Sequence, residues 1–154
     1  MSKSLKRVAE AIAQAGLDAE ILNPGPSRTA DEAAAACGCG LDQIVKSLIF
    51  QGPGGAIYLF LTAGGNRLDP EKAARVAGET LERANADTVR AVTGFAIGGV
   101  APLGHLTAPA IYADPRLTDF ATVYAAAGTP NHVFAVDPRA LFAACNAQMA
   151  EFTA

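Results

Sequence analysis

The seven residues Ile44–Phe50, IVKSLIF, indicate the fold more clearly than any other stretch of the sequence. Five of them are aliphatic or aromatic, a density typical of a β-strand that is buried on both faces. Lys46 interrupts the run near its start, and an ammonium group is costly to bury without a partner. We therefore expect Lys46 either to reach water from the end of the strand or to meet an anionic ligand.

The residues around this strand predict a hairpin. The apolar runs KSLIFQ (46–51) and AIYLFLT (56–62) flank GPGG, a sequence suited to a turn between two strands. Residues 23–28, NPGPSR, are expected to form a loop because of their proline and glycine content. Further short strands are predicted over residues 18–22, 108–114, 121–128 and 132–136.

Helices are predicted between these strands. Leu5, Val8, Ile12 and Ala15 recur at helical spacing near the N-terminus. Capping residues and terminal glycines mark two more helices, over 29–38 and 69–78, and a third short helix from residue 85 ends at Gly94. Asp137 and Pro138 open a last helix, which is expected to run to about Met149. A hairpin among interspersed helices predicts a mixed sheet, so we expect the α/β class and a single domain over 1–154.

The bulk composition limits the class of protein. A chain of 154 residues that is 51% hydrophobic and 18% charged can build its core without disulfides or metal. It contains no run of 18 apolar residues, so no membrane span is expected, and charges return too soon near the N-terminus for a secretory signal. We expect a cytoplasmic protein.

The cysteines and the net charge exclude further classes. Cys37, Cys39 and Cys145 form neither a CxxC pair nor part of a Cys/His cluster, so we expect buried free thiols, with no metal and no cofactor. A net charge of −3 argues against a protein that grips a long nucleic acid such as DNA by its phosphates. It allows contact with a few nucleotides at one end of a strand.

The stretch Thr93–His105, TGFAIGGVAPLGH, is the strongest candidate for chemistry. Its four glycines allow positive φ angles and close approach of a ligand, as in an oxyanion hole or anion nest. No GK[ST] sequence or dinucleotide fingerprint accompanies it. No carboxylate occurs between Asp87 and Asp114. The alternative is a plain connection between a helix and a strand.

Other candidates are weaker when taken alone. Strand alternation places Lys46 and Ser47 on opposite faces, which argues against a Ser–Lys dyad. His105 and His132 lack triad spacing and are more typical of surface or hydrogen-bonded histidines. The sequence GGNRLD, with Asn66, could bind a ligand or simply lead into the next helix.

Four motifs together resemble the YbaK/ProX family. They are TADEAAAACGCGLDQIVKSLIF, GGNRLDPEKAA, VTGFAIGGVAPLGH and YAAAGTPNHVFAV, and they occur in the order and at the spacing of that family from about Ala30 to the last helix. The family comprises aminoacyl-tRNA deacylases related to the editing insertion of bacterial prolyl-tRNA synthetase. The resemblance implies a partly barrel-like mixed sheet packed with helices, acting as a free-standing editing domain.

The resemblance also implies a set of site residues. The family's functional lysine corresponds to Lys46, and its G-x-x-x-P loop corresponds to Gly98–Pro102. We therefore expect Lys46, Gly98 and Gly99 to be catalytic. The expected substrate-binding residues are Val100, Ala101, Pro102, Asn66, Gly128, Thr129, Asn131 and His132.

The implied reaction is hydrolysis of the ester that joins an amino acid to the 3′ end of a tRNA, with prolyl-tRNA synthetase as a further partner. Loop backbone groups would stabilise the oxyanion, and no cofactor is required. We expect a mischarged tRNA, in the first place tRNA for proline, that carries alanine, 2-aminobutyrate, serine or threonine. The alternatives are a cysteinyl-tRNA deacylase of the YbaK type and a non-catalytic tRNA- or synthetase-binding module.

Overall fold

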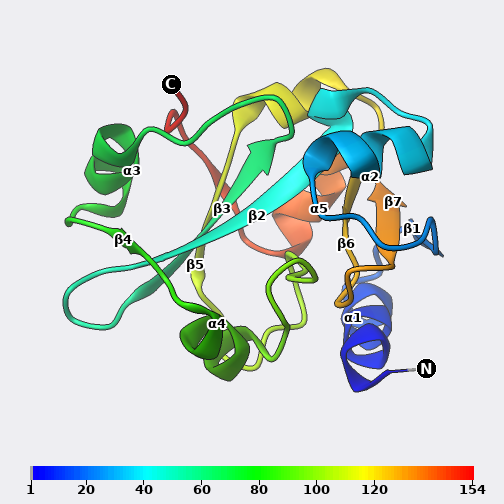
Figure 1. Ribbon diagram of the computed structural model, residues 1–154, viewed down its shortest axis with the longest axis horizontal. Coiled ribbons are helices and arrows are strands. Elements are labelled where there is room, and N and C mark those ends of the chain that lie inside the picture. The colour runs from blue at the N-terminus through cyan, green and yellow to red at the C-terminus, as the bar shows by residue number, and fades with distance from the viewer. Residues whose placement is uncertain (1) are drawn as a thin grey trace.

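The predicted hairpin lies at the centre of the fold in a computed structural model that describes residues 2–154 (Figure 1). Its strands β2 (Ile44–Gln51) and β3 (Ile57–Ala63) pair antiparallel, with Lys46 opposite Thr62. The turn is closed by a hydrogen bond from the Gly52 N–H to the Ala56 carbonyl. Apolar residues on both faces of these strands supply much of the core, as the sequence predicts.

The remaining strands extend the hairpin on both sides into one mixed sheet. Its order is β1 (Ala19–Leu22), β7 (Val133–Val136), β6 (Val123–Ala126), β2, β3, β5 (Ala110–Ala113) and β8 (Gln148–Met149), and β4 (Glu82–Arg83) also pairs with β2. The β2–β6, β3–β5 and β5–β8 pairs are parallel, and the others are antiparallel. The mixed α/β class is therefore confirmed.

The sheet has a gap beside β2. Strand β6 pairs with β2 through Ile44 and Val45, whereas β4 pairs with it through Phe50 and Gln51. Between these two short ladders, residues 46–48 of β2 have a paired strand on their β3 side but none on the other, within the described chain. The main-chain N–H and C=O groups on this edge of β2 are thus left without a neighbouring strand at residues 46–48.

Five α-helices surround the sheet in the described part of the chain. They are α1 (Lys3–Gln14), α2 (Ala30–Cys37), α3 (Pro70–Ala77), α4 (Ala86–Thr93) and α5 (Pro138–Ala144), with short 3-10 helices η1 (Leu41–Gln43) and η2 (Pro115–Asp119). The predicted N-caps of α2 and α3 are confirmed, and so are the predicted glycine stops of α2, α3 and α4. The side chains of Thr29, Asp69 and Asn85 accept hydrogen bonds from the first-turn N–H groups, and a left-handed glycine follows each helix.

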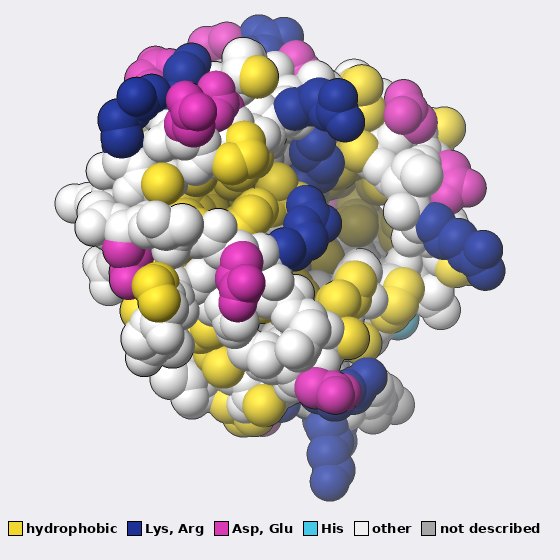
Figure 2. Space-filling model, turned by 60° about the vertical axis from the view of Figure 1, so that its left-hand side comes forward, with side chains coloured by type: hydrophobic (Ala, Val, Ile, Leu, Met, Phe, Trp, Pro, Cys, Tyr) yellow, Lys and Arg dark blue, Asp and Glu magenta, His cyan; other side chains and the backbone are white. Residues whose placement is uncertain are grey.

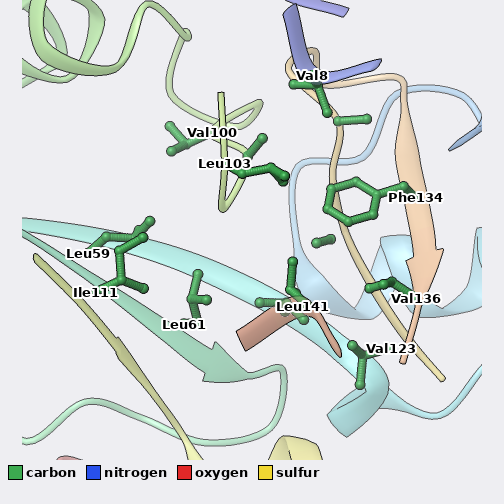
Figure 3. Packing of buried hydrophobic residues seen from close by; sticks show 14 of the residues in the cluster. Val8, Leu59, Leu61, Val100, Leu103, Ile111, Val123, Phe134, Val136 and Leu141 are labelled. Carbon is green, nitrogen blue, oxygen red and sulfur yellow. The ribbon is translucent and has the colours of Figure 1, made fainter. Parts of the chain in front are cut away.

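The main core anchors the glycine-rich segment that follows α4. Val100 and Leu103 are buried in the same cluster as Leu59 of β3 and Ile111 of β5 (Figure 3). Phe134 of β7 and Val8 of α1 extend this cluster on the other side. The segment is therefore held by its apolar side chains, which fixes the backbone between them.

The last helix differs from its prediction. It ends at Ala144 instead of running to about Met149, because Asn146 adopts a left-handed φ of 56° and the Ala147 N–H returns to the Phe142 carbonyl. The chain then forms β8 beside β5 and buries Phe152, whose ring centroid lies 4.9 Å from that of Phe60. Burial of this C-terminal phenylalanine in a second cluster requires the turn that ends the helix.

The structure adds two observations to the composition. Within residues 2–154, no helix is both long enough and apolar enough to cross a membrane. The three cysteines are free thiols, but each is partly exposed, so the expectation of buried thiols is wrong. Cys37 and Cys39 lie at the C-terminal end of α2, and Cys145 follows α5 and packs against the main core cluster.

The C-terminal anchor can be tested by mutation. Phe152→Ala is expected to lower the free energy of unfolding by about 3–5 kcal/mol, because it leaves a cavity beside Phe60. Met149→Ala, on a side chain that is 56% exposed, should change it by less than about 0.5 kcal/mol. Urea denaturation of both variants measures the difference, and equal stabilities would contradict the anchoring role.

Candidate functional site

Lys46 lies at the point where β2 leaves β6, on the wall of a cavity of about 270 Å³. Its Nζ donates a hydrogen bond of 2.5 Å to the main-chain carbonyl of Asn66. Among the described residues it forms no ion pair. The ammonium is therefore met by a peptide carbonyl, a partner that side-chain patterns in the sequence do not reveal.

The electrostatic surroundings of Lys46 disfavour its charged form. Partial burial lowers the pKa of Lys46 below its usual value, and the positive charges of Arg67 and Arg83 lower it further. Asp114 and Asp42 act in the opposite direction. An anionic group bound beside Lys46 would stabilise the ammonium.

The cavity wall combines apolar and cationic residues. Its lining residues are Pro24, Gly25, Ser27–Ala30, Ala33, Ile44–Leu48, Gly98, Val100, Tyr124, Ala126, Thr129, Pro130, His132 and Val133. None of them is a carboxylate. Figure 2 shows a hollowed face with hydrophobic side chains at its floor and both basic and acidic side chains around its rim. Such a wall suits a ligand that is neutral or anionic.

The two adjacent glycines of the loop have different environments. Gly98 lines the cavity with φ 91°, and an added Cβ there would meet nothing within 4 Å. Gly99 is buried, and a Cβ there would lie 2.9 Å from the Thr129 Cα. The Gly99 N–H donates to the Ala96 carbonyl at 3.0 Å, closing a turn. Of the two predicted oxyanion donors, Gly99 therefore already has a partner for its N–H. Among the described residues, the N–H groups of Gly98 and Val100 have none.

His105 and Arg7 hold this loop from behind. The His105 Nε2–H donates to the Ala101 carbonyl at 2.7 Å, and the ring packs edge-on against Phe95. Arg7 of α1 lies over Phe95 and donates to the Gly104 and Gly94 carbonyls at 2.8 and 2.9 Å. Burial lowers the pKa of His105. These contacts assign His105 to loop support rather than to the cavity wall.

The turn Gly128–Asn131 forms the facing side of the cavity. Thr129 Oγ1 is 2.7 Å from His132 Nδ1 and accepts a hydrogen bond from the Asn131 N–H. Gly128 has φ 96° and sits so close to α1 that an added Cβ would lie 2.8 Å from the Ser4 carbonyl oxygen. The turn is thus pressed between α1 and the Gly99 segment.

The structure brings the predicted site residues into one region, with different roles in its geometry. Those on the cavity wall are Lys46, Gly98, Val100, Thr129 and His132. Those just behind or beside it are Gly99, Ala101, Pro102, Asn66, Gly128 and Asn131. Ala101 and Pro102 are the buried end of the loop, and the Asn66 carbonyl accepts a hydrogen bond from Lys46.

Several wall residues were missed by sequence reasoning. Residues 24–28 were predicted only as a loop, and Thr29 and Ala30 only as the start of a helix, yet these residues border the cavity. The Ser27 N–H ties them to the facing turn by a hydrogen bond to the Pro130 carbonyl. Ser47 also borders the cavity, and its hydroxyl is buried without a hydrogen-bond partner among the described residues. No hydrogen bond joins Ser47 to Lys46 in this part of the chain, so a dyad is not formed.

The available chemistry is that of an ammonium group, main-chain N–H groups and an imidazole. In residues 2–154 no cluster of three His, Cys, Asp or Glu side chains could hold a metal ion. Burial raises the pKa of the Cys145 thiol to about 11, so that thiol is protonated at neutral pH. The wall is therefore equipped to orient a ligand and to stabilise developing negative charge.

Comparisons with known proteins place this geometry in context. The family model of the aminoacyl-tRNA editing domain matches residues 25–144. The chain is 35% identical over 115 residues to the uncharacterized protein YwhH of Bacillus subtilis, which covers 75% of this chain and 73% of that protein.

Two crystal structures extend the similarity over almost the whole chain. One is described as a candidate trans-editing enzyme for prolyl-tRNA synthetase; it is 44% identical, with a TM-score of 0.93 over 100% of this chain and 99% of that chain. The other, the hypothetical protein APE2540, is 32% identical, with a TM-score of 0.89 over 96% and 99%.

The buried imidazole predicts a pH dependence of stability. Because folding lowers the pKa of His105, the unfolded chain binds its proton at a higher pH than the folded chain does. Its contribution to the free energy of unfolding should be complete above about pH 6.5 and should be lost as the pH falls below that value. His105→Gln keeps a donor to Ala101 and should flatten this part of the profile. Urea denaturation between about pH 7.5 and about pH 5.5 tests this, and an unchanged profile in the variant would contradict it.

Proposed function

We propose that this chain, which belongs to the family of aminoacyl-tRNA editing domains and is an aminoacyl-tRNA deacylase, removes a small amino acid from a mischarged tRNA. The first candidate is tRNA for proline, since a neighbour of 44% identity is described as a candidate trans-editing enzyme for prolyl-tRNA synthetase. The proposed substrates are tRNAs that carry alanine, 2-aminobutyrate, serine or threonine. Such a reaction takes place in the cytoplasm, with prolyl-tRNA synthetase as the proposed partner.

The observation that carries this proposal is a cavity without carboxylates that holds both Lys46 and Gly98. Lys46 would bind the anionic backbone at the 3′ end of the tRNA, where a phosphate supplies the ion-pair partner that Lys46 does not have among the described residues. Ionic hydrogen bonds to phosphate are about twice as strong as neutral ones. The chain's own basic residues near Lys46, Arg67 and Arg83, support the same polarity of ligand.

Water is the proposed nucleophile. It attacks the carbonyl carbon of the ester, and the resulting oxyanion accepts hydrogen bonds from main-chain N–H groups of the loop. Gly98 and Val100 carry the candidate donors, because the Gly99 N–H is already bonded to Ala96. The bond to the ribose oxygen then breaks, that oxygen takes a proton, and the free amino acid and the tRNA 3′ hydroxyl leave. The vicinal ribose hydroxyl of the substrate would position the water.

Selectivity is proposed to be steric. A cavity of about 270 Å³ is slightly smaller than the usual ligand pocket, so a large amino-acid side chain would not fit together with the ribose. Apolar walls separate side chains that differ by one methylene by only about 1–3 kcal/mol. We therefore expect activity on several small amino acids rather than on one.

A panel of aminoacylated tRNAs tests the function directly. The wild-type protein is incubated with tRNA for proline charged with alanine, serine, threonine, cysteine or proline, and the ester remaining is measured over time. Hydrolysis of the small mischarged amino acids together with sparing of proline is expected. Preferential hydrolysis of the cysteinyl ester would favour the YbaK-type alternative, and no hydrolysis of any ester would refute the proposal.

Lys46→Ala is expected to slow deacylation by about 10- to 100-fold, which corresponds to the loss of one charge-assisted hydrogen bond worth about 1.5–3 kcal/mol. Lys72→Ala is a matched control, because Lys72 also donates to a main-chain carbonyl, that of Thr153, but does not line the cavity. Single-turnover kinetics on one charged tRNA give both rates. A folded Lys46→Ala protein with the wild-type rate would show that Lys46 takes no part in the reaction.

Gly99→Ala is expected to slow deacylation by about 10²–10³-fold, because its Cβ would collide with the Thr129 backbone and displace the loop donors. Val100→Ala, which only trims methyl groups, should stay within about tenfold. Gly54→Ala in the β2–β3 turn is the control, since a Cβ there meets nothing within 4 Å. The same kinetic assay orders the three variants. A Gly99→Ala rate equal to that of Gly54→Ala would show that the loop position is irrelevant.

A further inference from the structure

Asp114 is a buried carboxylate that does not line the cavity. It follows β5 and is 3% exposed, and its Oδ2 accepts hydrogen bonds from the Ala63 N–H at 3.1 Å and the Asn66 Nδ2 at 2.9 Å. Its Oδ1 accepts from the Arg116 N–H at 3.0 Å. No basic side chain lies within ion-pair distance of it among the described residues. The hydrogen bonds of this buried carboxylate therefore all come from N–H groups, of Ala63, Asn66 and Arg116.

A second carboxylate holds the same loop from the opposite side. Asp42 of η1 accepts a hydrogen bond from the Gly65 N–H at 2.8 Å. The preceding Gly64 sits so close to η1 that an added Cβ would lie 2.1 Å from the Leu41 carbonyl oxygen. Arg116 joins the two sides, because its Nε binds Asp42 at 3.0 Å while its main-chain N–H binds Asp114. The loop at residues 64–66 is thus clamped between η1 and the end of β5.

The clamp determines where one particular carbonyl points. Asn66 uses its side-chain amide to bind Asp114 and its main-chain oxygen to accept the Lys46 ammonium. Lys46 has no other hydrogen-bond partner in the described chain, so the position of the Asn66 carbonyl sets the position of Nζ. The charges that act on Lys46 are those of Asp114 and Asp42, which favour the ammonium, and of Arg67 and Arg83, which oppose it.

We propose that Asp114 is a positioning residue for deacylation, which fixes the Asn66 carbonyl and thereby orients the Lys46 ammonium at the cavity. Asp114 itself touches neither the substrate nor the reacting atoms. The inference rests on the proposed function of Lys46, but the physical link from Asp114 to Lys46 can be measured on the protein alone.

The first measurement is an NMR titration of the lysine side chains after dimethylation with ¹³C. The chain has four lysines, and the Lys46 signal is identified by its loss in Lys46→Arg. Asp114→Asn is expected to lower the pKa of Lys46 below its wild-type value, because the negative charge that favours the ammonium is removed. Asp119→Asn is the matched control. Asp119 also binds Arg116, but it is not among the charges that act on Lys46, so the Lys46 titration should not change.

The second measurement is a double-mutant cycle in single-turnover deacylation. Asp114→Asn is expected to slow the wild-type reaction by about 10- to 100-fold, the cost of misplacing a positioning group by about 1 Å. In the Lys46→Ala background the same change should have little further effect, because there is no ammonium left to orient. Asn66→Ala, which removes the bond to Asp114 from a partly exposed loop, should slow the reaction in the same direction and serves if Asp114→Asn does not fold.

An unchanged Lys46 titration in folded Asp114→Asn would overturn the inference, and so would a rate loss of equal size with and without Lys46. Both results would leave Asp114 as a residue of general stability. If the wild-type protein hydrolyses no charged tRNA, the proposed function fails instead, and the titration still reports whether Asp114 acts on Lys46.

Discussion

The ammonium of Lys46 has to be held at the start of a strand that is otherwise apolar, and most features of the site follow from how this is done. A carboxylate partner would neutralise the charge and leave nothing for an anionic ligand. A peptide carbonyl satisfies one N–H of the ammonium and keeps the charge available. The carboxylates that stabilise this arrangement stand one step further away, behind the loop that carries the carbonyl.

The glycine-rich loop depends on contacts with elements that are distant in the sequence. Helix α1 supports it through Arg7, and the same helix presses on the turn at Gly128. The Thr129 backbone of the same turn lies against Gly99. Three layers of backbone therefore stack with no room for a side chain between them. Gly99 and Gly128 are therefore needed because they lack a side chain and let the backbones approach, a requirement that only the packing reveals.

The parts of the fold that were predictable have local causes. Side-chain caps and terminal glycines mark α2, α3 and α4 within a few residues, so the sequence alone places them well. The end of α5 was mispredicted because its cause is tertiary: Phe152 has to reach Phe60, which lies far away in the chain. In the site, the four motifs pointed to Lys46 and to both loops, whereas the roles assigned to these residues remain predictions. Residues 24–28 are predicted to form a loop by their proline and glycine content, and such a signal does not show that the loop borders a cavity. The Asn66 carbonyl is a main-chain atom, which no residue type specifies.

The gap beside residues 46–48 of β2 has a consequence for what can enter the site. An open strand edge normally invites another strand to pair with it, which is a route to aggregation. Here β6 and β4 close the edge at both ends, so that only a few peptide groups are open. The open stretch is too short for a second polypeptide to form a β-ladder along it. Its open peptide groups at residues 46–48 can nevertheless be reached by a single polar group.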